Sequence, residues 1–410
     1  MRYTLLAPSE VKAAIQLPAS KSISNRALII NALARGNCPP ENLSDCDDTR
    51  VMVRALTGSN DIIDILAAGT AMRFLTAYLS VTPGTATITG TQRMQQRPIQ
   101  LLVDALRELG AQIEYVGQEG FPPLRITGTE LKGGELTLKG SVSSQYISAL
   151  LMVGPALTNG LLLHLTGEII SRPYINLTLQ LMKEFGASAS WVSETDIRVL
   201  PQPYRSVPFK VESDWSAASY WYQIVALSEE AEIELLGLFN HSYQGDSRGA
   251  EVFARLGVHT EFTSRGVKLT KKGELPTSLN EDFIDIPDLA QTFVVTCALL
   301  NIPFRFTGLQ SLKIKETDRI TALRNELKKL GCLIQEENDS VLMWNGERCE
   351  PETHPVIATY EDHRMAMAFA PAALCLPNLV IAEPHVVSKS YPGYWDDLTK
   401  AGFRLQPSGD

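Results

Sequence analysis

A histidine and an arginine open an apolar segment late in the chain. The stretch "TYEDHRMAMAFAPAALCL" (359–376) places His363 and Arg364 directly before a run of apolar, helix-forming residues. Because no polar face follows, we expect this helix to be buried on almost all sides. A buried cation is costly unless a negative group pairs with it. We therefore expect either a carboxylate of the protein or an anionic ligand beside Arg364.

Similar residues stand at the starts of other apolar helices. They are Lys21, Ser22 and Arg26; Gly69, Thr70 and Arg73; Ser143, Ser144 and Gln145; and Asp288. A helix N-terminus offers free N–H groups and a partial positive charge, both of which favour an anion. If these helix ends converge, they form an anion-binding site.

Each motif also has a purely structural interpretation. Ser143 and Asp288 are typical helix caps when taken alone. The charges of "KETDRI", Lys315–Arg319, are typical of a salt-bridged first turn. Arg97 precedes a proline that favours a helix start, and a lone His363 is more often structural than catalytic. The recurrence of cations in apolar contexts nevertheless favours a ligand site, because independent caps would not place them so often.

Common cofactor motifs do not occur in the sequence. It contains no GxxxxGK[ST], no GxGxxG after a strand and no HExxH. The six histidines lack the spacing of metal ligands. We therefore expect acid–base chemistry on anionic small molecules, performed by polar side chains without a metal or organic cofactor.

The composition is that of a globular protein, with 410 residues, 44% hydrophobic and 20% charged. The net charge of -9 argues against nucleic acid and anionic membranes as partners. The six cysteines are scattered without a CxxC pair, which favours a reducing compartment and no metal cluster. Since neither a signal-peptide core nor a membrane-spanning apolar run is present, we expect a cytoplasmic protein.

The elements that carry these residues repeat along the chain. An amphipathic helix, a glycine and a strand-like stretch recur, with successive glycines 71 to 76 residues apart. These glycines are Gly110, Gly186, Gly257, Gly331 and Gly402. A more apolar helix recurs with the same period, and short strands lie between the helices, which indicates an α/β fold. We expect six repeats, the first of which, between Arg26 and Arg73, is shortened.

Six repeats grouped three and three predict two similar domains. The segments "QLPASKS" near Pro18 and "FKVESDWS" near Glu212 each follow a strand and precede a buried helix. Placing the chain crossings there gives a first domain of residues 19–212. The second domain is discontinuous, with residues 1–18 and 213–410. We expect the active site in the cleft between the domains.

Eight stretches together resemble the EPSP synthase family, the 3-phosphoshikimate 1-carboxyvinyltransferases. They are "PASKSISNRALIINALA", "AAGTAMRFL", "RMQQRPIQLLVDALRELGA", "GSVSSQYISALLM", "SRPYINLTLQLMKEFGA", "QGDSRGAEVFARLG", "KIKETDRITALRNELKKLG" and "YEDHRMAMAFAPAAL". The resemblance implies two domains, each of three βαβαββ units with buried parallel helices, that close on the substrates. The related UDP-N-acetylglucosamine enolpyruvyl transferases share this fold but not this set of motifs.

The resemblance also implies a reaction. Phosphoenolpyruvate and 3-phosphoshikimate would give 5-enolpyruvylshikimate 3-phosphate and inorganic phosphate, a step of the shikimate pathway towards chorismate and the aromatic amino acids. Family members need no cofactor, are typically monomers and include the target of glyphosate.

The matching motifs imply roles for individual residues. Asp288 is expected to take the proton of the 5-hydroxyl, and Glu316 to protonate the methylene of the enolpyruvyl group. Lys21, His363 and Lys389 would assist the departing phosphate. The residues expected to bind phosphoshikimate are Lys21, Ser22, Arg26, Ser143, Ser144, Gln145, Ser171, Tyr174, Asp288 and Lys315. Those expected to bind phosphoenolpyruvate are Lys21, Gly69, Arg73, Arg97, Gln145, Arg319, Arg364 and Lys389.

The chain departs from the family pattern at several points. Ala67 and Ser311 each replace an asparagine, and the first repeat is short. Phe74 follows Arg73 where proline is common, and we expect it to shift that helix and to alter glyphosate sensitivity. Two alternatives remain open: an enolpyruvyl transferase with another acceptor, and a non-catalytic anion-binding relative.

Overall fold

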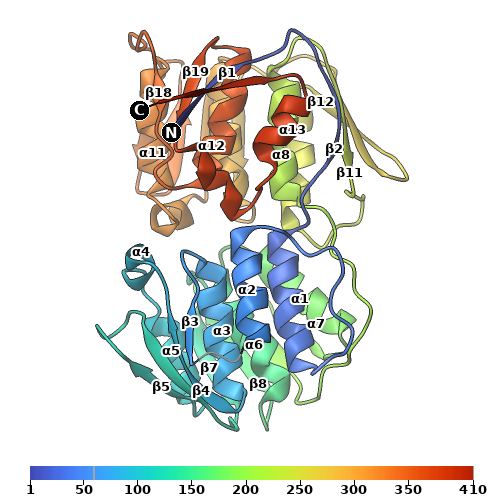
Figure 1. Ribbon diagram of the computed structural model, residues 1–410, viewed down its shortest axis with the longest axis vertical. Helices are drawn as coiled ribbons and strands as arrows, with labels where there is room; N and C mark the ends of the chain where they lie inside the picture. Colours follow the sequence, from blue (N-terminus) through green and yellow to red (C-terminus); the bar gives the residue numbers. More distant parts are fainter. Residues whose placement is uncertain (59–60, 410) are drawn as a thin grey trace. The chain divides into compact units, whose positions relative to one another are not determined.

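The computed structural model describes residues 1–58 and 61–409. The chain forms two compact units (Figure 1). We call Ala19–Glu212 the continuous unit and Met1–Pro18 with Ser213–Asp410 the split unit. No helix in the described residues is both long and apolar enough to cross a membrane.

The continuous unit contains short strands and longer helices. The strands are β3 (Ile62–Asp64), β4 (Gly84–Thr89), β5 (Gln112–Tyr115), β6 (Leu124–Gly128), β7 (Gly134–Lys139), β8 (Leu161–Thr166), β9 (Ala189–Trp191) and β10 (Asp196–Val199). The helices are α1 (Lys21–Leu33), α2 (Asp47–Thr57), α3 (Gly69–Val81), α4 (Gln92–Gln95), α5 (Gln100–Glu108), α6 (Ser144–Val153), η1 (Gly154–Ala156) and α7 (Arg172–Glu184).

The split unit alternates strands and helices in the same way. The strands are β1 (Arg2–Leu6), β2 (Val11–Gln16), β11 (Ala231–Leu236), β12 (Val258–Phe262), β13 (Gly266–Lys271), β14 (Leu279–Asp282), β15 (Phe304–Thr307), β16 (Gln335–Glu337), β17 (Val341–Trp344), β18 (Val356–Ile357), β19 (Leu379–Ala382) and β20 (Arg404–Ser408). The α-helices are α8 (Trp215–Leu227), α9 (Gly249–Ala254), α10 (Ala290–Leu299), α11 (Arg319–Lys329), α12 (His363–Phe369) and α13 (Tyr394–Lys400). The 3₁₀ helices are η2 (Gly245–Arg248), η3 (Pro287–Leu289), η4 (Gln310–Ile314), η5 (Ala370–Leu374) and η6 (Pro384–Lys389).

Five four-stranded sheets in the described residues share one topology. Their orders are β3-β4-β6-β5, β7-β8-β10-β9, β2-β11-β13-β12, β14-β15-β17-β16 and β18-β19-β1-β20. In each sheet the first strand runs parallel to the second, and the other pairs are antiparallel. Each sheet therefore corresponds to one βαβαββ unit, and the predicted α/β fold is confirmed.

The apolar helices form the core of each unit. In the continuous unit α3 packs against α6 and α1, and in the split unit α10 packs against α8 and α12. The sequence of α10, "AQTFVVTCAL", has no polar face, and its Phe293 packs against Phe253 with ring centroids 4.2 Å apart. Such helices are buried on all sides, so functional side chains can only stand at their ends.

The first repeat is shortened, as the sequence predicted. Residues 19–58 form α1 and α2, and the structure describes no named strand there. An extended segment, residues 200–212, runs beside them instead. Its Tyr204 donates to the carbonyl of Met152 at 2.8 Å, and Glu41 exchanges backbone hydrogen bonds with Phe209 and Val211. The segment thus supplies backbone hydrogen-bond partners to Glu41, between α1 and α2.

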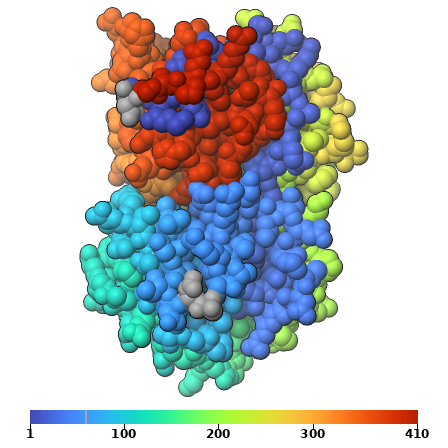
Figure 2. Space-filling model, in the orientation of Figure 1, coloured from blue at the N-terminus to red at the C-terminus, as the bar shows by residue number. Residues whose placement is uncertain are grey.

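The N-terminal strand completes the last sheet of the split unit. β1 lies between β19 and β20, with Arg2 opposite both Ala382 and Ser408. Figure 2 shows these N-terminal residues, in blue, set into the red C-terminal surface. The two ends of the chain are therefore built into one sheet.

Candidate active site

A buried arginine joins three carboxylates in the split unit. The side chain of Arg319, at the start of α11, is 1% exposed. Its Nε donates to Oδ2 of Asp362 at 2.7 Å, and its Nη2 donates to Oε2 of Glu316 at 2.8 Å. Its Nη1 donates to Oδ1 of Asp288 at 3.2 Å. Burial alone would lower the pKa of Arg319, but the three carboxylates outweigh it and raise the pKa, so the guanidinium stays charged.

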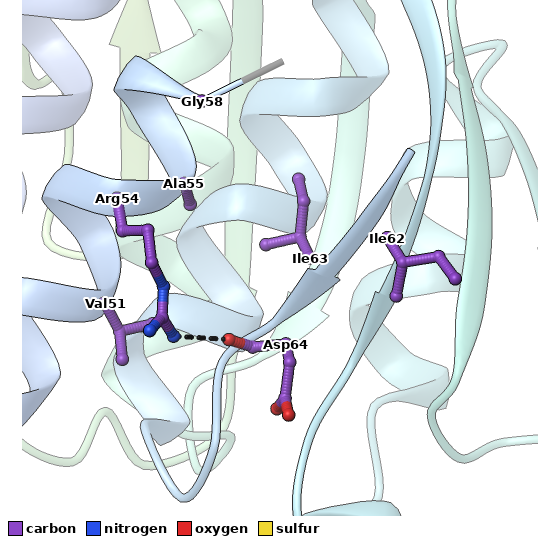
Figure 3. Close-up of a pocket in the computed structure, with 7 residues that line it drawn as sticks. All are labelled: Val51, Arg54, Ala55, Gly58, Ile62, Ile63 and Asp64. Atoms are coloured by element: carbon purple, nitrogen blue, oxygen red, sulfur yellow. Dashed lines mark hydrogen bonds between the residues drawn. The ribbon is translucent and has the colours of Figure 1, made fainter. Parts of the chain in front are cut away.

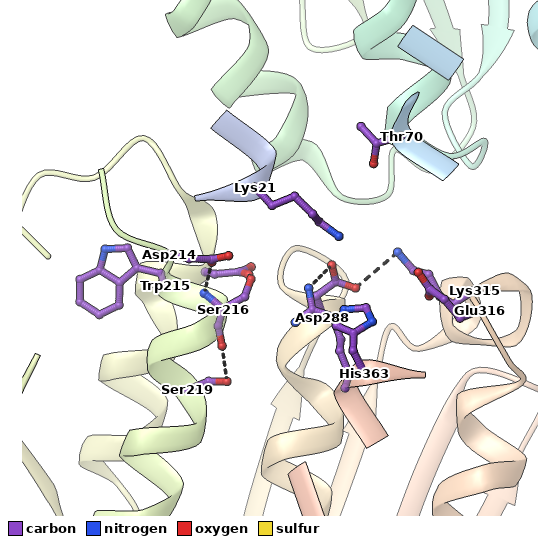
Figure 4. Close-up of polar contacts among 12 residues, drawn as sticks. Lys21, Thr70, Asp214, Trp215, Ser216, Ser219, Asp288, Lys315, Glu316 and His363 are labelled. Atoms are coloured by element: carbon purple, nitrogen blue, oxygen red, sulfur yellow. Dashed lines mark hydrogen bonds and ion pairs between the residues drawn. The ribbon is translucent and has the colours of Figure 1, made fainter. Parts of the chain in front are cut away.

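Asp288 also meets two further cations. Arg364 donates from Nη2 to Oδ2 of Asp288 at 3.0 Å, and Nζ of Lys315 lies 3.4 Å from Oδ1. Figure 4 shows Lys315 directed at this carboxylate. Burial raises the pKa of Asp288, but Arg364, Lys315 and Arg319 outweigh burial and hold the pKa well below its ordinary value. Asp288 is therefore a carboxylate at neutral pH and can accept a proton.

Glu316 is paired through both of its carboxylate oxygens. Oε2 accepts from Arg319, and Oε1 lies 2.7 Å from Nζ of Lys389. Two adjacent cations favour the ionised form of a carboxylate.

Asp362 organises the start of α12. Its Oδ1 accepts from the backbone N–H of Arg364 at 2.9 Å, which makes Asp362 the N-cap. The His363 side chain is 1% exposed, with Nδ1 3.7 Å from Oδ1 of Asp362. Protein carboxylates thus lie beside Arg364, which was the first of the two possibilities left open by the sequence.

Anionic ligands suit this cluster by charge. Its cations are Lys315, Arg319, Arg364 and Lys389, and its carboxylates are Asp288, Glu316 and Asp362. Four cations against three carboxylates leave a net charge of +1 when His363 is neutral. A phosphate or carboxylate group entering the cluster would meet an excess of positive charge.

A further buried carboxylate lies near Asp288. Asp246, in η2, is 5% exposed and accepts a hydrogen bond from the Ser216 hydroxyl. Burial and the negative charge of Asp288 raise the pKa of Asp246 to about 7. This carboxyl therefore changes charge near neutral pH.

The continuous unit carries its own cations at helix starts. Nζ of Lys21, the first residue of α1, lies 3.3 Å from Oδ2 of Asp48 on α2. Arg26, 3% exposed, donates to Thr178 Oγ1 at 2.7 Å, to the Ser22 carbonyl at 2.9 Å and to Ser148 Oγ at 3.1 Å.

The environment of Arg26 favours a bound anion. The three hydrogen-bond partners above are neutral oxygens, and burial lowers the pKa of Arg26 to about 10. A buried cation with neutral partners is stabilised strongly when a negative group approaches it. Arg26 therefore fits the predicted role of a phosphate or carboxylate ligand.

Gly69 leaves room for two guanidinium groups. A Cβ at this position would lie 2.6 Å from Nη1 of Arg97 and 3.1 Å from Nη1 of Arg73. Arg73 also donates to the Gly69 carbonyl at 3.0 Å, and Gln145 donates to Thr70 Oγ1 at 3.2 Å. Two forked cations around one backbone position can grip an anion bidentately.

The predicted serines differ in their local structure. Ser143 caps α6 by accepting from the backbone N–H of Gln145 at 3.3 Å, so the capping interpretation is confirmed for it. For Asp288 that interpretation is wrong, because the N-cap of α10 is Leu289. Ser171 directly precedes α7 and lies in the left-handed region, with φ of 54°, and its side chain makes no capping hydrogen bond. Non-glycine residues in this region are strained, and such strain gathers at functional sites.

A pocket between α2 and β3 contains none of the predicted site residues. Figure 3 shows its lining residues, among them Val51, Ile63 and Asp64, and the 3.0 Å hydrogen bond from Arg54 to the Asp64 carbonyl. The lining is mostly apolar, so this pocket is not suited to bind two anionic substrates.

Comparisons with known proteins agree with the motifs. The family model of EPSP synthase (3-phosphoshikimate 1-carboxyvinyltransferase) matches residues 5–58 and 55–398. The chain belongs to the EPSP synthase family. A Bacteroides fragilis protein named 3-phosphoshikimate 1-carboxyvinyltransferase is 75% identical over 406 residues, which are 99% of each chain. A Vibrio cholerae protein of the same name is 38% identical over 98% of this chain and 99% of its own.

A solved structure supports the fold independently. The EPSP synthase from Acinetobacter baumannii superposes with a TM-score of 0.80 and covers 99% of this chain and 100% of its own, at 20% identity. At that identity the likeness bears on the fold alone. Taken with the sequence relatives, these comparisons confirm the predicted family and the predicted class of enzyme.

Three positions depart from the EPSP synthase pattern. Phe74 is fully buried within α3, and the guanidinium carbon of Arg26 lies 5.2 Å from its ring centroid. The hydroxyl of Ser311, in η4, is buried and has no hydrogen-bond partner among the described residues. Ala67 lies just before the start of α3. The expected effect of Phe74 on glyphosate stays a prediction.

Sequence reasoning missed several carboxylates around the site. Asp362 could have been found, because it precedes the helix start that carries His363 and stands at a typical N-cap position. Asp48 and Asp246 could not, because each meets its partner through tertiary packing: Asp48 pairs with Lys21 from α2, and Asp246 binds Ser216 from η2.

Proposed function

We propose that the protein transfers the enolpyruvyl group of phosphoenolpyruvate to the 5-hydroxyl of 3-phosphoshikimate and releases inorganic phosphate. The observation that carries this proposal is the position of Asp288. Its carboxylate is held ionised by Arg319, Arg364 and Lys315, and Arg319 also binds Glu316. An ionised carboxylate next to a second carboxyl group, among cations, suits acid–base chemistry on anions.

Both units are proposed to bind substrate. The phosphoshikimate ligands are Lys21, Ser22, Arg26, Ser143, Ser144, Gln145, Ser171, Tyr174, Asp288 and Lys315. The phosphoenolpyruvate ligands are Lys21, Gly69, Arg73, Arg97, Gln145, Arg319, Arg364 and Lys389. Arginines predominate in the second set because their planar forks match carboxylate and phosphate oxygens.

Asp288 and Glu316 divide the proton transfers of the addition step. Asp288 takes the proton of the 5-hydroxyl as that oxygen forms a bond to C2 of phosphoenolpyruvate. The electron pair of the C2–C3 double bond takes a proton from Glu316, so C3 becomes a methyl group. The product is a tetrahedral ketal that still carries phosphate.

Elimination then restores the double bond. The bond between C2 and the phosphate oxygen breaks, phosphate leaves with the bonding pair, and C3 returns one proton to Glu316. Lys21, Lys389 and His363 stabilise the departing phosphate. The proton taken by Asp288 leaves with the products, which balances the reaction.

Substrate binding can itself prepare Glu316 to act as an acid. Glu316 is bound to Arg319 and Lys389, both of which are proposed ligands of phosphoenolpyruvate. When the substrate carboxylate and phosphate take these cations, the ionised form of Glu316 loses its partners and protonation becomes easier. The acid would therefore form only when its substrate is present.

A phosphate-release assay tests the proposal. The purified protein is mixed with phosphoenolpyruvate and 3-phosphoshikimate. No metal is added, because the proposed enzyme is a monomer that needs no cofactor. Release that needs both substrates supports the proposal. Binding without release would favour the anion-binding alternative, and release only with another hydroxylated acceptor would favour a different transferase.

A further inference from the structure

A strained turn leads directly into α12. Asp362 N–H donates to the Thr359 carbonyl at 2.9 Å and closes a four-residue turn. Its two central residues, Tyr360 and Glu361, both have a φ of 55°. Positive φ at both central positions is typical of type I′ turns, which favour Gly, Asn and Asp. Tyrosine and glutamate are unfavourable there, so other contacts must hold the turn in place.

A buried carboxylate provides those contacts. Glu326 on α11 is 0% exposed, and its Oε1 accepts from the Tyr360 hydroxyl at 2.6 Å. Its Oε2 accepts from the Ala358 N–H at 3.0 Å and from Nζ of Lys329 at 2.7 Å. Lys329 also donates to the Val356 carbonyl at 2.9 Å. Burial, with the neighbouring Glu326 carboxylate, raises the pKa of Tyr360 to about 12, so its hydroxyl remains a donor at neutral pH.

The same helix holds the far side of the turn. Arg319, seven residues before Glu326 on α11, binds both carboxylate oxygens of Asp362 at 2.7 and 3.3 Å. A helical separation of seven residues spans about 10 Å along a rigid axis. Helix α11 therefore holds Tyr360 through Glu326, and it holds Asp362 through Arg319. Only Glu361 lies between these two contacts.

We propose that Glu326 and Tyr360 are positioning residues for the Asp362–His363–Arg364 segment. They hold the unfavourable turn in the one geometry that lets Asp362 cap α12 and bind Arg319. This geometry also places Arg364 against Asp288. The inference rests on the proposed function, because it assigns the turn a role in that reaction.

The proposal predicts a particular kinetic pattern. Loss of the Tyr360 hydroxyl would let the turn relax, which would misplace Arg319 and Arg364. Both are proposed ligands of phosphoenolpyruvate, whereas most proposed phosphoshikimate ligands belong to the continuous unit. We expect kcat to fall and KM for phosphoenolpyruvate to rise, with KM for phosphoshikimate nearly unchanged.

The test compares Tyr360→Phe with a matched control. Tyr360→Phe removes one hydroxyl and keeps the ring. Tyr222→Phe removes another buried hydroxyl of the split unit, which contacts Thr260 at 2.9 Å. A hydrogen bond to a charged group is strong enough that we expect kcat/KM for phosphoenolpyruvate to fall about tenfold or more in Tyr360→Phe. In Tyr222→Phe it should stay within about twofold of the unmodified protein.

A rescue separates positioning from general stability. Glycine adopts positive φ without strain, so Glu361→Gly should stabilise the native geometry of the turn, in which residue 361 has a φ of 55°. Added to Tyr360→Phe, it is expected to recover most of the lost kcat. Equal kinetics for Tyr360→Phe and Tyr222→Phe, with only the melting temperature lowered, would overturn the proposal. If Tyr360→Phe does not fold, Glu326→Gln, which keeps the size of the side chain, takes its place.

Hydrogen exchange keeps this proposal distinct from the proposed function. If the unmodified protein releases no phosphate from the two substrates, the proposed function fails. The order of the turn is then measured by the hydrogen-exchange rates of the Asp362 and Arg364 amides. Faster exchange in Tyr360→Phe than in Tyr222→Phe would support the positioning network, and equal exchange would refute it.

Discussion

Arg364 and Asp288, 76 residues apart in the chain, are joined by a 3.0 Å hydrogen bond from Nη2 to Oδ2. Arg364 stands at the start of α12, and Asp288 lies in η3, which leads into α10. The two positions are about one repeat apart, so the repeated topology brings equivalent helix starts together. Each residue offsets the cost of burying the other. The repeat thus assembles the charged cluster from segments that are individually apolar.

Replacing Asp288 should separate catalysis from binding. We expect Asp288→Asn to lower kcat by about 10²–10⁴, the usual contribution of a general base, while phosphoshikimate binding remains measurable. Asp339→Asn is the control, because Asp339 pairs with Lys313 on the surface and its side chain is 77% exposed. Initial rates of phosphate release measure the effect. Turnover within about tenfold of the unmodified protein would remove Asp288 from its role as the base.

The same substitution predicts an acid-dependent change in stability. The folded-state pKa of Asp288 is lowered, so its stabilising effect is present above the ordinary carboxyl pKa and is lost as pH falls through the folded value. Removing one partner of a buried ion pair costs about 3 kcal/mol. We expect Asp288→Asn to lower the free energy of unfolding by about that amount from pH 5 to pH 8. Denaturation at several pH values should show the difference shrinking only in strong acid.

The raised pKa of Asp246 leads us to predict the opposite pH dependence of stability for this residue. Its folded-state pKa of about 7 lies above the ordinary value, so its contribution to stability is greatest below pH 4 and is lost as pH rises through 7. Asp246→Asn keeps an acceptor for Ser216 and cannot ionise. Compared with this variant, the protein should lose up to about 4 kcal/mol of unfolding free energy between pH 4 and pH 8. A pH-independent difference would contradict the assignment.

The repeated fold could be predicted because its signals are local. Glycine-ended amphipathic helices recur at a steady interval, and apolar helices such as α10 have no polar face to place in solvent. Residues 200–212 could not be placed, because their role depends on tertiary contacts such as that from Tyr204 to Met152. Extended segments without periodicity carry little information about what they cover.

The predicted site likewise contains residues that could be recognised from the sequence and residues that could not. His363 and Arg364 stood out because cations at an apolar helix start are unusual. Their partners Asp288 and Asp362 lie in or next to the quoted motifs. Glu326, by contrast, looks like an ordinary exposed residue of an amphipathic helix, yet it is fully buried. Its burial follows from the turn that packs on α11, which no local pattern reveals.

Gly69→Ala tests the two-guanidinium site. The new Cβ would lie 2.6 Å from Arg97 Nη1, so that side chain must move. We expect KM for phosphoenolpyruvate to rise about tenfold with a smaller change in kcat, since about 1.4 kcal/mol of binding is lost. The fold should tolerate the change, because alanine favours a helix more than glycine does. Gly117→Ala is the control, as its Cβ meets only Pro123 at 3.7 Å. A change confined to phosphoshikimate binding would place Gly69 in the other substrate site.

Ser171 predicts different outcomes for two small substitutions. Its φ of 54° is strained for serine and unstrained for glycine, so Ser171→Gly should keep the free energy of unfolding or raise it by about 0.5–1 kcal/mol. Ser171→Ala keeps the strain and loses the hydroxyl. If the hydroxyl binds the substrate phosphate, both variants should lose about tenfold or more in phosphoshikimate affinity.

Titration calorimetry with phosphoshikimate measures the effect of losing the Ser171 hydroxyl on affinity. Denaturation curves measure the effect of relieving the backbone strain on stability. Asn378→Gly, at a φ of 63° in the split unit, relieves a left-handed residue without touching the proposed site. It should raise stability and leave affinity unchanged. Full affinity in Ser171→Gly would show that the hydroxyl is not a ligand. Lost affinity in Ser171→Gly, with stability kept, would mean that the strained backbone at Ser171 serves to aim its hydroxyl at phosphate.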